Sequence, residues 1–189
     1  ELVTAIKSGV LQGCKNLKHL SFLSSVTTIE NNAFRGCDKL TKIIIPSSVT
    51  SIGNNVFDRC SSLEQIVIPS SVKSLGNNIF NECTALTSIE IPSSITSIPK
   101  GCFQGCINLT QITIPNSITS IGNYAFSRCK SLGNITIPSS VKSIGENAFL
   151  DCSKLSQITI PNSIASIEKG VFNKCISLNK ILIPSSINS

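Results

Sequence analysis

The feature that most constrains this chain is an unbroken period of 23 residues. Leucine recurs at Leu17, Leu40, Leu63, Leu86, Leu109, Leu132, Leu155 and Leu178, with 23 positions from each to the next. A unit this short cannot fold alone, because ordering its backbone costs more free energy than burying its few apolar side chains gains. Stacked units bury one another, so the period predicts a solenoid with one continuous core.

Two stretches of each unit alternate between apolar and polar residues. In the copy that begins at Leu40, Ile43 and Ile45 alternate with outward positions and predict a short strand with one buried face. Pro46 removes a backbone donor and ends that strand. Val49 and Ile52 alternate in the same way and indicate a second extended stretch.

The last part of the unit has a different spacing. After a turn at Gly53, the apolar residues Val56, Phe57 and Cys60 stand at i, i+1 and i+4, which predicts one or two helical turns. The asparagines ahead of them suit either a turn or a helix start. We therefore expect an α/β repeat with a parallel sheet on the concave side of the solenoid and short helices on the convex side.

Composition excludes several classes of function. The 16 Lys and Arg residues, against 10 Asp and Glu, are scattered over different repeat positions, and Tyr124 is the single Tyr in a chain without Trp. A nucleic-acid interface would gather basic residues beside aromatic ones. The apolar runs are shorter than the ~18–20 residues of a membrane span, so we expect no membrane insertion. With His19 as the only histidine and no paired carboxylates, we expect no catalytic site and no cofactor.

The nine cysteines favour a structural role. Eight occupy one repeat position beside the Phe: Cys14, Cys37, Cys60, Cys83, Cys106, Cys129, Cys152 and Cys175. We predict buried free thiols there, since helices packed ~8–10 Å apart would keep neighbouring cysteines beyond disulfide reach. The ninth, Cys102, stands four residues before Cys106. That pair could approach each other or share a soft metal, but nothing nearby completes a metal site, and we predict none.

The unit LTKIIIPSSVTSIGNNVFDRC from Leu40, with its copies, resembles the BspA-like class of leucine-rich repeat, whose pattern is LxxIxIPxSVxxIGxxAFxxC. The resemblance implies a right-handed leucine-rich-repeat solenoid with a concave parallel β-sheet. It also implies a place among surface and secreted proteins associated with adhesion. The chain departs from the pattern at few positions, such as Leu23 in place of the Pro and Cys102 in place of the Ala.

We predict a single solenoid over residues 1–189. It has a partial unit at 1–16, full units starting at 17, 40, 63, 86, 109, 132 and 155, and a truncated unit at 178–189. Neither end carries a polar cap, so we expect the parent chain to continue in both directions or the segment to associate end to end.

Outward positions of the predicted concave sheet are the least constrained by packing. Ile44 and Val67 place branched apolar groups outward on adjacent strands, which either marks a protein contact or is ordinary surface exposure. A row of Thr113, Thr136 and Thr159 is either part of a ligand site or simply suits an exposed strand. The candidate ligand-binding residues are His19, Lys42, Ile44, Gln65, Val67, Glu90, Gln111, Thr113, Asn134 and Thr136.

These observations predict a non-enzymatic, adhesin-like module that binds a protein or glycan on its concave face, within a larger surface or secreted protein. One alternative is a structural spacer that extends a stalk. Another is a cytoplasmic scaffold that docks a protein partner.

Overall fold

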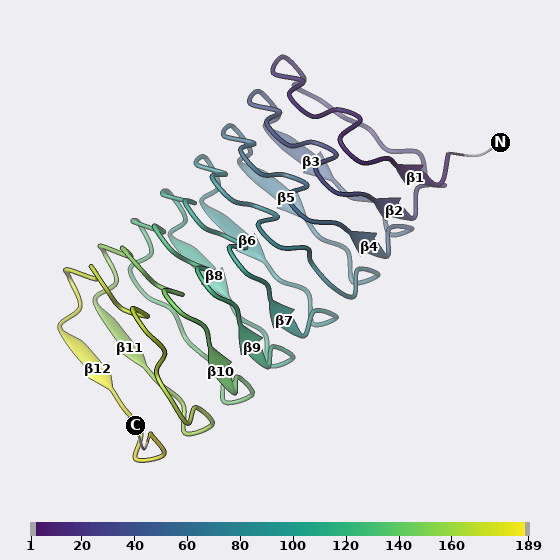
Figure 1. Ribbon diagram of the computed structural model, residues 1–189. Helices are drawn as coiled ribbons and strands as arrows, with labels where there is room; N and C mark the ends of the chain where they lie inside the picture. The colour runs from purple at the N-terminus through teal and green to yellow at the C-terminus, as the bar shows by residue number, and fades with distance from the viewer. Residues whose placement is uncertain (1–2, 188–189) are drawn as a thin grey trace.

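A computed structural model describes residues 3–187 and shows a solenoid in which successive coils stack along one axis (Figure 1). Two rows of short strands follow this axis. The first row contains the three-residue strands β3 (Lys42–Ile44), β5 (Gln65–Val67), β6 (Ser88–Glu90), β8 (Gln111–Thr113), β11 (Gln157–Thr159) and β12 (Lys180–Leu182). The second row contains the two-residue strands β1 (Ala5–Ile6), β2 (Thr28–Ile29), β4 (Ser51–Ile52), β7 (Ser97–Ile98), β9 (Ser120–Ile121) and β10 (Ser143–Ile144).

All strand pairs are parallel, and their register follows the sequence period. Lys42 pairs with Gln65, and Ser97 pairs with Ser120, in each case 23 positions apart. The predicted parallel solenoid and its second extended stretch are therefore confirmed. The first row divides into the pairs β3–β5, β6–β8 and β11–β12, so β5 and β6 lie side by side without pairing. Between β8 and β11, Asn134 makes only an isolated bridge to Gln157. Gly133 precedes this bridge, and glycine weakens a strand because it has no side chain to pack.

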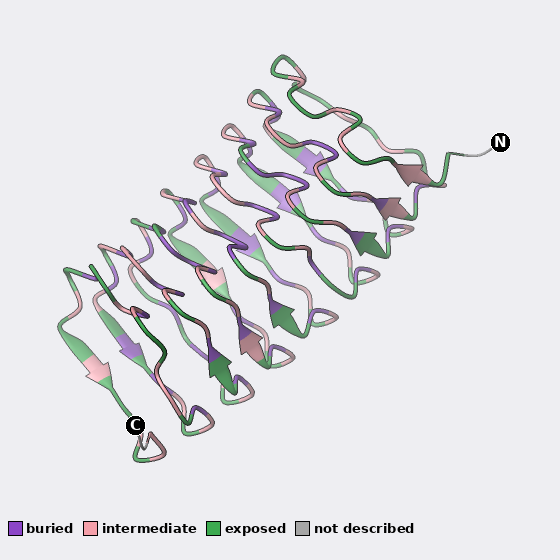
Figure 2. Cartoon of the chain, in the orientation of Figure 1, coloured by how far each residue is buried: buried purple, intermediate pink, exposed green. Residues whose placement is uncertain are grey.

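The core runs the length of the solenoid, and each coil contributes the same side chains. Leu40, Val49, Phe57 and Cys60 are fully buried, as are most of their counterparts in other coils (Figure 2). The Phe rings from Phe34 to Phe172 stack nearly parallel, with centroids 5.3–5.9 Å apart. This separation is close to the ~4.8 Å between paired strands, so each ring packs on its equivalent in the next coil.

The predicted convex helices are wrong, because the structure has no helix within residues 3–187. The segment from Asn54 to Cys60 forms successive turns instead. Asn55 and Arg59 have φ angles of 54° and 61°, in the left-handed region that a right-handed helix excludes. The fold is therefore an all-β repeat rather than an α/β one.

Hydrogen bonding between coils explains this difference. The amides of Asn55, Phe57 and Arg59 donate to carbonyls of the next coil, at 2.9, 3.0 and 2.8 Å. A helix would use those amides within its own coil. It would also need ~8–10 Å between neighbouring axes, about twice the spacing that the paired strands impose.

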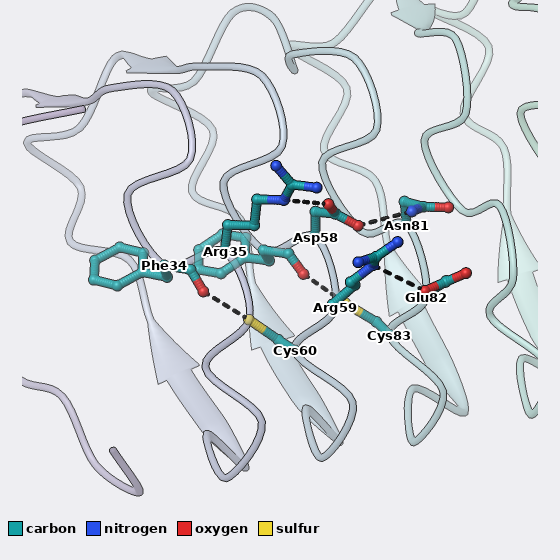
Figure 3. Close-up of polar contacts among 9 residues, drawn as sticks. Phe34, Arg35, Asp58, Arg59, Cys60, Asn81, Glu82 and Cys83 are labelled. Carbon is teal, nitrogen blue, oxygen red and sulfur yellow. Dashed lines mark hydrogen bonds and ion pairs between the residues drawn. The ribbon is translucent and has the colours of Figure 1, made fainter. Parts of the chain in front are cut away.

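Polar side chains join the coils along the same edge (Figure 3). The buried carboxylate of Asp58 accepts hydrogen bonds from Arg35 Nε at 2.8 Å and from Asn81 Nδ2 at 2.7 Å. Next to it, Arg59 Nε donates to Glu82 Oε2 at 3.1 Å. Each of these contacts links residues of neighbouring coils, so they stabilise the stack.

Candidate functional site

The candidate site is the strand face, which we define as the outward side chains of β3, β5, β6, β8, β11 and β12. In these strands the middle residue is buried or half-buried and its two neighbours are exposed. This alternation arises because successive side chains of a strand point to opposite sides. The predicted outward positions on these strands are therefore confirmed as exposed.

A groove of about 1080 Å³ hollows the middle of the strand face, over β5, β6 and β8. Five of the predicted residues line it: Gln65 and Val67 on β5, Glu90 on β6, and Gln111 and Thr113 on β8. Their placement follows from the parallel register, which sets Glu90 opposite Thr113 and Ser88 opposite Gln111.

Lys42 and Ile44 lie on β3, beside this groove. Ile44 pairs with Val67 across the two strands, and these side chains are 60% and 61% exposed. Two branched aliphatic side chains at that exposure form a small apolar patch at one end of the groove.

Asn134 and Thr136 belong to a second, smaller depression of about 330 Å³. They line it together with Gln157 and Thr159 of β11 and with Lys180 and Leu182 of β12. Seven of the ten predicted site residues therefore line one of two hollows on the same face, and Lys42 and Ile44 lie beside the larger one.

His19 is exposed, as predicted, but it lies in none of the strands and does not line either hollow. In its coil, Phe22 replaces the repeat Ile, and the Phe22 ring stands at 89° to that of Phe34, whereas the other stacked rings are nearly parallel. The segment around His19 consequently lacks the strand geometry of the later coils.

Sequence reasoning missed Glu64, which lines the groove from the position just before β5. Glu64 stands outside the predicted strands, to which all the predicted site residues belong. A signal was present, because Glu64 is the only carboxylate at its repeat position, where other coils have Lys18, Thr41, Thr87, Thr110, Gly133, Ser156 and Asn179.

The repeat cysteines are free thiols, and all but Cys14 are buried. Contrary to the expectation, helix spacing does not keep them apart, since the coils are only about 4.8 Å apart. The buried repeat thiols instead donate to carbonyls of the preceding coil: Cys60 Sγ donates to the Phe34 carbonyl at 3.2 Å and Cys83 Sγ to the Phe57 carbonyl at 3.1 Å (Figure 3). Burial raises the pKa of Cys37 to about 11 and that of Cys106 to about 12, so these thiols stay protonated and able to donate.

Cys102 and Cys106 are both buried free thiols. Within residues 3–187, no group of three or more His, Cys, Asp or Glu is arranged to hold a metal ion. The same part of the chain also has no helix that could cross a membrane.

Comparison with solved structures identifies proteins of the same architecture. A leucine-rich repeat protein from Bacteroides ovatus ATCC 8483 has a TM-score of 0.85 and 30% identity, over 98% of this chain and 53% of that chain. The T. pallidum leucine-rich repeat protein TpLRR has a TM-score of 0.55 and 30% identity, over 83% of this chain and 63% of that chain. The pneumococcal vaccine antigen PcpA, at a TM-score of 0.68 and 24% identity over 96% of this chain and 55% of that one, shares the fold.

The chain thus spans about half the length of the Bacteroides ovatus protein. None of the curated proteins compared with it matches. A family model described as BspA type leucine-rich repeat region matches residues 1–108 and 74–189, in six copies. The two matched ranges together cover the whole sequence, and the chain therefore belongs to the BspA type leucine-rich-repeat family.

Proposed function

We propose that this chain is a non-enzymatic, adhesin-like binding segment of a larger surface or secreted protein, and that its strand face holds the ligand. The observation that carries the proposal is the exposed pair of Ile44 and Val67 beside the groove. Burying an aliphatic side chain contributes roughly 1.5–3 kcal/mol when burial is complete, so a partner that covers this patch gains free energy there.

Variation along the strand face supports the same proposal. The core and turn positions repeat from coil to coil, whereas one outward column reads Lys42, Gln65, Ser88, Gln111, Asn134, Gln157 and Lys180. These side chains stand on a parallel sheet whose backbone is fixed by bonds between coils. A preordered surface loses little conformational entropy on binding, so many modest contacts can add up to useful affinity.

A spacer or stalk is the second candidate, and the unbroken 23-residue period favours it. In that case the coils only set a distance, and a ligand would bind elsewhere in the parent chain. The surface location rests on what the BspA-like resemblance implies, and the intracellular scaffold is its alternative.

A pull-down with the purified segment tests these candidates. The native chain is compared with Ile44→Glu combined with Val67→Glu, using cell-surface and matrix extract beside cytosolic extract. The matched control is Ser74→Glu combined with Ser97→Glu, which places two glutamates at exposed positions of neighbouring coils away from the strand face. Circular dichroism establishes that every variant folds.

We expect a partner from the surface and matrix extract that both the native chain and the control capture and that the strand-face variant loses. A partner that comes only from cytosol would move the protein to the intracellular scaffold. A strand-face variant that captures the same partners as the native chain, or no partner from either extract, would reject binding on this face and favour the spacer.

A further inference from the structure

The groove at the middle of the strand face is acidic, although the chain as a whole has a formal net charge of +6. Its lining includes the carboxylates of Glu64 and Glu90 and contains no Lys, Arg or His. The basic residues of the strand face, Lys42 on β3 and Lys180 on β12, lie outside this lining. A ligand that enters the groove therefore meets negative charge only.

Both carboxylates are available to such a ligand. The ion pairs formed within residues 3–187 are Lys7–Glu30, Arg35–Asp58, Arg59–Glu82 and Lys130–Asp151, and none of them involves the groove. Glu64 and Glu90 are exposed, so a cation from a partner can reach them without displacing a contact inside the protein.

The sheet under the groove is also uncovered on one side. Parallel sheets are usually covered on both faces because the crossover connections place helices there, and this solenoid has no such helix within residues 3–187. Here the inner face packs on the core, while Ile44 and Val67 present aliphatic groups on the open one. The apolar pair and the groove together form an unpartnered surface with one end apolar and its middle acidic.

We propose that the occupant is an extended, basic protein segment in which an aliphatic residue and a Lys or Arg stand two positions apart. This inference rests on the proposed function and specifies its ligand. Ile44, Val67 and Glu90 occupy the same outward position on the adjacent strands β3, β5 and β6. The paired strands β3 and β5 are ~4.8 Å apart, and β6 lies beside β5 without pairing, in a coil whose Phe103 ring is 5.6 Å from Phe80 of the β5 coil. These residues therefore lie at roughly 0, 4.8 and 10.4 Å along the solenoid axis.

An extended segment lying along that axis matches these positions. If its aliphatic side chain sits midway between Ile44 and Val67, at about 2.4 Å, the side chain two residues away lies a further ~6.7 Å along. That distance places it at about 9 Å, within about 1.5 Å of Glu90 along the axis, where a long Lys or Arg side chain reaches the carboxylate and gains an ion pair. The intervening residue points away from the face.

The same features disfavour a carbohydrate. Sulfated and sialylated glycans are anionic, and Glu64 and Glu90 repel them. Neutral sugars commonly stack on aromatic rings, and the residues that line the groove include no aromatic side chain. The structure thus selects a basic protein segment among the ligand classes of an adhesin-like module.

Titration of the isotope-labelled segment with short peptides, followed by NMR, tests the inference. The probe is acetylated Ser-Ser-Val-Ser-Lys-Ser-Ser, and the matched peptide has Glu in place of Lys. A third peptide, Ser-Ser-Val-Lys-Ser-Ser-Ser, keeps the composition but makes Val and Lys adjacent. The protein variants are Glu90→Gln and, as the control, Glu146→Gln, which removes an exposed carboxylate outside the groove.

We expect the probe to shift resonances of β5, β6 and β8 and to bind about threefold or more tightly than the other two peptides, as is usual for one exposed ion pair. Glu90→Gln should remove that preference, and Glu146→Gln should keep it. Equal binding of the Lys and Glu peptides, or probe shifts outside the groove, would overturn the inference. Capture of an anionic glycan through the strand face in the pull-down would also overturn it while leaving the proposed function intact.

Discussion

Replacing Arg128 by glycine should stabilise this protein, against the usual effect of glycine. The φ angle of Arg128 is 63°, a left-handed conformation that costs a residue with a Cβ about 1–2 kcal/mol. Glycine avoids this cost but loses about 0.5–1 kcal/mol of extra backbone entropy. The difference is a gain of about 0.5–1 kcal/mol in the free energy of unfolding. The chain already has glycine at equivalent positions, with φ of 70° at Gly36 and 72° at Gly105.

Urea denaturation under reducing conditions, followed by circular dichroism, measures the effect. Arg128 is exposed and belongs to none of the ion pairs within residues 3–187, so its replacement breaks no ion pair. As a control, Lys142→Gly changes an exposed residue whose φ is not positive. Glycine there only adds backbone entropy to the unfolded chain, so the free energy of unfolding should fall by about 0.5–1 kcal/mol.

The reverse change completes the test. By the same balance, Gly105→Ala should lower the free energy of unfolding by about 0.5–1 kcal/mol, because it forces a Cβ into φ 72°. The loss is larger to the extent that Glu82 Cγ, 3.1 Å from that Cβ, does not move away. If Arg128→Gly instead lost about 1 kcal/mol, as glycine does inside a helix, the assignment of this segment to turns would be refuted.

Three further predictions concern the coil contacts. Phe103→Ala should lower the free energy of unfolding by about 3–5 kcal/mol, because the Phe103 ring is fully buried and stacks on a ring on each side. Phe172→Ala should lower it by less, because Phe172 is only partly buried, and urea unfolding compares the two variants. Asp58→Ala should lower the free energy of unfolding by about 1–3 kcal/mol, because Arg35 loses its ion-pair partner. A change near zero would show that this ion pair does not stabilise the stack. Burial raises the pKa of Cys37 from an unfolded value of about 8.5 to about 11. The protonated, buried thiol therefore contributes its full stabilisation below about pH 8.5. As the pH rises from there to 11, the free energy of unfolding falls by ~1.4 kcal/mol per pH unit. Unfolding between pH 8 and 11 should show this fall, and Cys37→Ala should make it shallower.

The sequence predicted the coil repeat, the strand register and the core, since each follows from positions that recur every 23 residues. It did not predict the turns around Asn55 and Arg59. A spacing of i, i+1 and i+4 fits both a helix and successive turns, and the difference lies in the sign of φ, which apolar spacing does not show. The glycines at Gly36 and Gly105 were a hint, because glycine favours the left-handed region.

For the candidate site, alternation within a strand was enough to predict the exposure of Ile44 and Val67. The groove was not predictable in the same way. It depends on where neighbouring coils leave space, and its lining includes Glu64, which stands before the strand rather than within it. The outward position of His19 was predicted from its place in the repeat, but the strand that would have carried it is missing from its coil.

The side chains that hold the coils of this solenoid together are not those of the strand face. The repeated side chains are committed to neighbouring coils: Phe57 stacks on Phe80, the Cys60 thiol donates to the Phe34 carbonyl, and Ser48 Oγ donates to the Val26 carbonyl. Within residues 3–187, no side-chain hydrogen bond or ion pair joins the outward residues of the strand face from coil to coil. Substitutions there therefore leave in place the bonds that hold the coils together. For this reason a loss of binding by strand-face variants that remain folded distinguishes a recognition surface from a spacer, whereas stability measurements alone do not.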